Sequence, residues 1–120
     1  TWQRLNVTAF IASAIVGQTP AIIGEPYRDA SANQYMPMIV QPMMIYQADG
    51  DGLRKAYQRA MERDVRLAIF TMDLFSTLDD IANRAAVADK TADALDLVGI
   101  GLRDMKKTVD KVIKGLKLHP

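Results

Sequence analysis

The chain has 120 residues, of which 49% are hydrophobic and 24% are charged, and this profile predicts one globular domain spanning residues 1–120. A net charge of +1 argues against general polyanion binding, because such binding scales with the number of phosphates neutralised. The absence of cysteine excludes disulfides and a cysteine nucleophile, and the single histidine, His119, disfavours a zinc site built from imidazoles. We therefore expect no metal and no cofactor.

Residues 2–16 are apolar on almost every side, which predicts a helix buried in a core. The longest apolar run, residues 7–16, is too short to cross a bilayer, so no membrane is expected. No secretory signal is visible, which favours the cytoplasm. Because the chain enters a helix at once after Thr1, we expect a first strand upstream of it.

The stretch from residue 18 to residue 34 lacks a core pattern and contains turn-forming residues, with the turn expected near Ser31. It is a candidate functional or subunit-contact arm. Residues 35–48 are rich in Met, Ile, Val and Tyr, which is typical of a strand covered on both faces. Because Pro37 and Pro42 cannot donate to a ladder, we expect an edge position, or a bulge that splits this run into two strands.

The second half alternates helix and strand. The segment 49–52, DGDG, lacks the later ligands of a calcium loop and is interpreted as a turn that leads into an amphipathic helix over 53–63. The remaining predicted elements are a strand over 65–72, a helix from Ser76 to about Ala88 with Asp79 in a capping box, a strand over 94–102, and a helix that is N-capped by Asp104 and ends at Gly115.

This order of elements predicts a three-layer α/β/α sandwich around a mixed, mainly parallel sheet of about four strands. Asp73 follows a buried strand, where ligands gather in open α/β sheets, although an aspartate at such a position is more often a turn or helix-cap residue. The Gly99-Ile-Gly101 run precedes a helix. It indicates either an anion-binding turn or close backbone packing.

The last helix carries a lysine stripe. Lys107, Lys111 and Lys114 lie at i, i+4 and i+7, opposite the apolar face, and Asp110 is placed to pair with Lys114. The stripe is either a solvated face or a phosphate-binding face. Aromatic residues do not interleave with it, so base stacking is not indicated.

Residues 109–118, VDKVIKGLKL, resemble the closing segment of type-two peptidyl-tRNA hydrolases, and the glycines at 99 and 101 match a strand end of those enzymes. The whole chain is similar to an uncharacterised bacterial family of unknown function that shares the type-two peptidyl-tRNA hydrolase-like fold. The segments that carry this likeness are WQRLNVTAF at 2–10, GEPYRD at 24–29, QP at 41–42 and the tail.

The resemblance implies a site made of a lysine, an aspartate and a threonine. Asp73 matches the aspartate, Arg4 is the nearest cation to the lysine position, and Ala94 and Asp96 stand where the threonine would be. We therefore predict a small-ligand-binding or regulatory protein without the full hydrolase site, with Arg4, Asp73, Lys107 and Lys111 as ligand-binding candidates. The alternative is a hydrolase of peptidyl- or aminoacyl-RNA esters, with Asp73 as the catalytic residue that orients water and Arg4, Lys107 or Lys111 holding phosphate. A homodimer and an RNA or small anionic ligand are the expected partners.

Overall fold

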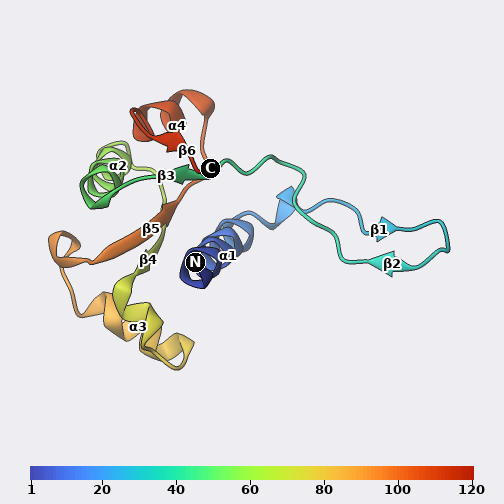
Figure 1. The fold of residues 1–120 in the computed structure, drawn as a ribbon, viewed down its shortest axis with the longest axis horizontal. Helices are drawn as coiled ribbons and strands as arrows, with labels where there is room; N and C mark the ends of the chain where they lie inside the picture. Colours follow the sequence, from blue (N-terminus) through green and yellow to red (C-terminus); the bar gives the residue numbers. More distant parts are fainter.

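The structure is a computed structural model that describes residues 1–120. A body built from four helices and two antiparallel strand pairs carries an arm that projects to one side (Figure 1). The helices are α1 (Trp2–Gln18), α2 (Gly50–Glu62), α3 (Asp80–Ala88) and α4 (Lys106–Val112). The strands are β1 (Tyr27–Arg28), β2 (Gln34–Tyr35), β3 (Tyr46–Gln47), β4 (Ala68–Thr71), β5 (Leu97–Gly101) and β6 (Lys117–Leu118). Short 3₁₀ turns are η1 (Pro20–Ile22), η2 (Met72–Phe75) and η3 (Ala92–Ala94).

The sheet prediction is wrong. The strands form three antiparallel pairs, β1–β2, β3–β6 and β4–β5, and do not form a mainly parallel sheet of about four strands in a three-layer sandwich. The reason lies in the connection from β4 to β5. Because η2, α3 and η3 turn back at one end of β4, β5 returns alongside it in the opposite direction. The structure accordingly does not confirm the peptidyl-tRNA hydrolase-like fold.

Helices cover both faces of the β4–β5 pair. On one face α1 lies so close that a Cβ added at Gly99 would stand 2.7 Å from Val7 Cγ1, and one added at Gly101 would collide with Ile11. This close approach confirms the backbone-packing interpretation of the two glycines. The prediction that α1 is buried all round is wrong, because Val7 is its only buried residue.

The core lies on the other face of the sheet. Ala56 and Ala60 of α2, Val65 and Val112 of α4 form a buried cluster. Partly buried residues complete it: Leu67, Ile100, Leu102, Ile113 and Leu116. The amphipathic pattern predicted for α2 is confirmed, and Asp49 caps the helix by accepting a hydrogen bond from the Gly52 amide at 2.7 Å.

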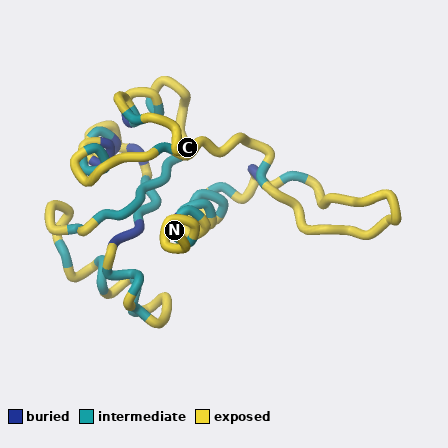
Figure 2. Tube along the Cα trace, in the orientation of Figure 1, coloured by how far each residue is buried: buried dark blue, intermediate teal, exposed yellow.

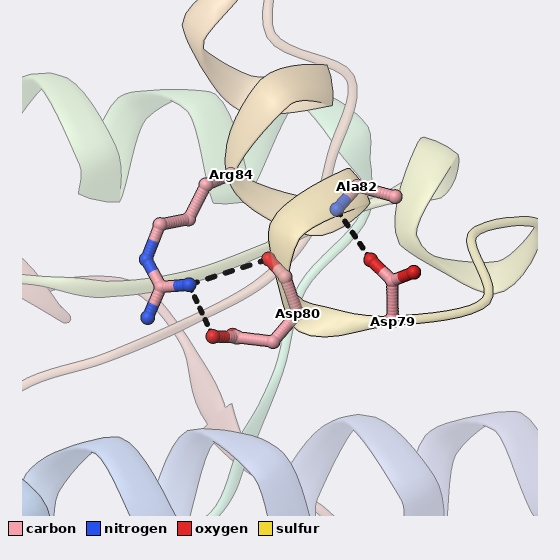
Figure 3. Close-up of polar contacts among 4 residues, drawn as sticks. All are labelled: Asp79, Asp80, Ala82 and Arg84. Carbon is pink, nitrogen blue, oxygen red and sulfur yellow. Dashed lines mark hydrogen bonds and ion pairs between the residues drawn. The ribbon is translucent and has the colours of Figure 1, made fainter.

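Two helix starts differ from prediction by a few residues. Asp79, not Ser76, caps α3, because its carboxylate accepts from the Ala82 amide at 2.7 Å while Arg84 pairs with Asp80 in the first turn (Figure 3). The N-cap of α4 is Met105 rather than Asp104, and the Asp104 carboxylate accepts from the Met105 amide just before the helix.

The strand expected over 35–48 belongs mostly to the arm, which we define as residues 23–45. The bridge between Ile23 and Ile39 and the β1–β2 pair make it a two-stranded ribbon. The expected turn near Ser31 is at its tip, and only Tyr46–Gln47 reaches the body, where it pairs with β6. None of residues 23–45 is buried (Figure 2). No helix of the chain is long and apolar enough to cross a membrane.

Candidate functional site

Asp73 lies in η2, directly after β4, where the sequence predicted it. Its carboxylate accepts a hydrogen bond from Lys90 Nζ at 2.6 Å, and both side chains are about one-third exposed. The hydrogen bond to Asp73, together with the negative charges of Asp73, Asp96 and Asp89, raises the pKa of Lys90. The Asp73 carbonyl accepts from the amide and hydroxyl of Ser76. Asp73 is therefore a carboxylate that is already paired within the chain.

Sequence reasoning missed Lys90 as the partner of Asp73. Lys90 follows the end of α3, 17 residues after Asp73, and nothing in the local pattern says that α3 folds back over η2. The available signal was one lysine close in sequence to three acids, Asp89, Asp93 and Asp96. A lysine in such surroundings is a candidate for an ion pair, but its partner requires the fold.

The other three candidate residues lie elsewhere. Arg4 Nη1 is 3.3 Å from His119 Nε2, so the start of α1 meets the C-terminal tail. Lys107 and Lys111 are exposed on α4, which packs against α2 on the far side of the β4–β5 pair from η2 (Figure 1). The structure thus places the four candidates in three separate regions. A phosphate-binding role of the lysines stays a prediction.

The ion pair expected between Asp110 and Lys114 is not formed. Asp110 accepts from Lys106 Nζ at 2.8 Å instead, and this hydrogen bond raises the pKa of Lys106. The Lys114 carbonyl accepts from Arg59 of α2. Because α4 ends at Val112, Lys114 has left the helix and no longer stands one turn after Asp110.

A hollow lies between α1, β4, η2 and α3. Its volume is about 250 Å³. Apolar side chains make up most of its wall, among them Phe10, Ala14, Phe70 and Leu74. The rings of Phe10 and Phe70 have centroids 6.0 Å apart, and Phe70 in turn packs against Phe75 with centroids 5.1 Å apart, both pairs in tilted geometry.

Three polar side chains also line the hollow: Asn6, Ser13 and Asn83. The Ser13 hydroxyl donates to the Phe10 carbonyl at 2.6 Å. The hydroxyl of Thr77 donates to Asn83 Oδ1, which leaves the NH₂ group of Asn83 as the donor for another partner. Leu74, which lines the hollow, directly follows Asp73 in η2. Sequence reasoning did not find this hollow, because its lining comes from four separate elements.

The comparisons with known proteins identify the family of this chain. The family model described as "Protein of unknown function (DUF2000)" matches residues 1–120. The chain belongs to the DUF2000 family. A solved structure of a protein of unknown function from Agrobacterium tumefaciens strain C58 is similar to the DUF2000 chain, with 46% sequence identity and a TM-score of 0.96. The match covers 99% of this chain and 88% of that chain. None of the curated proteins matches the DUF2000 chain described here.

Proposed function

We propose that the protein binds a small ligand in the hollow between α1 and β4. The observation that carries the proposal is the composition of the hollow, a mainly apolar wall with a few polar groups. Small-molecule sites have this composition, because apolar contact provides affinity and a few polar groups orient the ligand. The volume of about 250 Å³ favours a compact ligand.

The polar groups indicate the chemistry of that ligand. The Asn83 side chain is oriented by Thr77 and offers NH₂ donors, and Asn6 contributes a second amide. A ligand with an apolar body and one acceptor group, such as a carbonyl or hydroxyl, fits these residues. A strongly charged ligand does not, because none of the residues that line the hollow is ionisable.

The hydrolase alternative finds less support in this geometry. Asp73 is paired with Lys90, and Arg4 contacts His119 rather than Asp73. Arginine is also a poor proton shuttle, because its pKa is far above the working range. We therefore rest no catalytic step on these residues.

The test is binding of uncharged fragments followed by NMR on isotope-labelled protein. We expect at least one class of aromatic amide or alcohol to shift the backbone signals of Ala14, Leu74 and Asn83 together. Ala14→Trp should abolish these shifts, because Ala14 is an exposed residue of the wall and an indole ring at this position would fill the hollow. Ala85→Trp is the control, since Ala85 is an exposed alanine of α3 outside the hollow. Fragments that bind Ala14→Trp and the wild type equally would contradict the proposal.

A further inference from the structure

The arm, residues 23–45, exposes large apolar side chains without covering any part of the body. After β2, on the limb of the arm that returns to the body, Met36, Met38 and Val40 are 87%, 61% and 70% exposed. Ile39 forms a bridge to Ile23, and the backbone on either side of it is hydrogen-bonded to Gly24 and Ile22. Further exposed apolar residues follow in Met43 and Met44. Contiguous exposed apolar surface of this kind marks interaction sites in soluble proteins.

A second apolar surface is uncovered on α1. Leu5, Ala9, Ala12 and Val16 follow one another at helical spacing on the side of α1 that faces away from the sheet. Leu5 is 70% exposed, Ala9 is exposed, and the other two are only half-buried. A helix that is apolar all round requires a cover on every side. The arm of the same chain leaves the end of α1 and points away from the body, so it does not supply that cover (Figure 1).

We propose that two copies of the chain form a two-fold dimer in which the arm of each lies along the outer face of α1 of the other. A two-fold axis pairs both uncovered surfaces at once, because each copy offers an arm and receives one. The proposal goes beyond ligand binding and does not rest on it, since the outer face of α1 is separate from the side that lines the hollow.

The surface area supports a second copy as the occupant. A compact monomer of 13.3 kDa is expected to expose about 6,450 Å², whereas this chain exposes 8978 Å². The excess of about 2,500 Å² per chain is what an extensive, obligate homodimer interface removes. The radius of gyration agrees, at 16.0 Å against about 13.6 Å for a compact chain of this length.

The distribution of charge also favours this occupant. The chain has 15 basic and 14 acidic residues, but only Arg4, Glu25, Arg28 and Asp29 precede residue 49. The arm and α1 therefore carry few charged side chains, and the charges of these four residues sum to zero. A nucleic acid or a strongly charged protein would find no complementary charge here, whereas the two uncharged surfaces suit each other.

The first experiment is sedimentation velocity of the wild-type chain at micromolar concentration. We expect twice the 13.3 kDa mass of one chain, and a monomer would overturn the proposal. The double variant Met36→Lys, Met38→Lys should sediment as a monomer that keeps its helical circular dichroism. The matched control is Met61→Lys with Met105→Lys, two exposed methionines on α2 and beside α4, which should stay dimeric. A dimer that persists in the arm variant would overturn the proposal.

The second experiment identifies which surfaces meet. Because the chain has no cysteine, Met38→Cys and Ala9→Cys variants can be prepared with different tags, mixed and treated with a short bismaleimide. We expect cross-links between the two tagged species. Met61→Cys mixed with Ala9→Cys should give none. Cross-links of Met38→Cys only with itself would indicate arm-to-arm packing and would overturn the assignment.

Discussion

The body and the arm obtain their order in different ways. In the body, helices bury side chains on both faces of the β4–β5 pair, as in the Ala56, Ala60 and Val112 cluster. The arm has no buried residue and depends on hydrogen bonds along its ribbon, such as those from the Gly24 amide to the Met38 carbonyl and from the Val40 amide to the Ile22 carbonyl, both 2.9 Å.

A two-stranded ribbon without a core is marginally stable in water. Packing defects should therefore unfold the body, whereas changes on the exposed side of the arm should leave folding nearly intact and act on assembly.

The largest expected effect is at Gly101. An alanine there would drive its Cβ into Ile11, so we expect Gly101→Ala to lower the free energy of unfolding by about 1–3 kcal/mol, as overpacked cores do. Urea unfolding followed by circular dichroism measures the change. Gly17→Ala is the matched control, because nothing lies within 4 Å of an added Cβ in α1 there, and a gain of up to about 1 kcal/mol is expected. Equal stabilities of the two variants would contradict the close packing of α1 on β5.

Arg54 links α2 to the segment that leads into β5, and its loss should have the next largest effect. Its guanidinium donates to the carbonyls of Ala92 at 3.0 Å, Asp93 at 3.4 Å and Leu95 at 2.7 Å. We expect Arg54→Ala to cost about 1–2 kcal/mol in urea unfolding, because hydrogen bonds to charged groups are stronger than average and these are partly solvated. Lys55→Ala, an exposed neighbour, should cost little. If both variants cost the same, the Arg54 hydrogen bonds do not stabilise this connection.

Local patterns in the sequence predicted the elements of the body better than the relations between them. The helix over 53–63 was predicted because its apolar period and the turn at 49–52 before it are local signals. The direction of one strand relative to its neighbour is not encoded by local sequence. Whether β5 runs with or against β4 depends on where α3 turns, and no residue of either strand encodes it.

The arm was misinterpreted for a related reason. Residues 35–45 have the Met, Ile and Val content of a buried strand, and composition cannot say whether the cover comes from the same chain or from another. The candidate site shows the same limit, since the position of Asp73 after β4 was predictable whereas its pairing with Lys90 was not.

A smaller effect is expected at the start of α3. Asp79→Ala removes the carboxylate that accepts from the Ala82 amide (Figure 3), and loss of such a cap costs about 1 kcal/mol. Asp80→Ala removes only the exposed pair with Arg84, and about 0.3–0.5 kcal/mol is expected. Urea unfolding of the two single variants separates the roles. A larger cost for Asp80→Ala would show that the ion pair, not the cap, holds the helix start.

The smallest effect on global stability is expected at the tip of the arm. The Asp29 carboxylate accepts from the amides of Ser31 at 2.9 Å and Asn33 at 3.0 Å, and from the Tyr35 hydroxyl at 2.7 Å. Asp29→Asn should leave the urea midpoint of the body unchanged, because no body residue takes part. Amide exchange at Ser31 and Asn33 should nevertheless become faster, which hydrogen-exchange NMR measures.

The dependence on pH follows from the same contacts. The hydrogen bonds, that from Tyr35 first, lower the pKa of Asp29 from 3.8 to about 2. A carboxylate with a lowered pKa stabilises the folded form fully above its ordinary pKa, and that contribution is lost as the pH falls through the lowered value. The tip should therefore keep its amide protection down to about pH 4 and lose it between there and about pH 2, without a matching loss in Asp29→Asn. Protection that fades at the same pH in both proteins would mean that the whole ribbon, rather than the Asp29 contacts, is opening, and the arm would then depend on the body for its order.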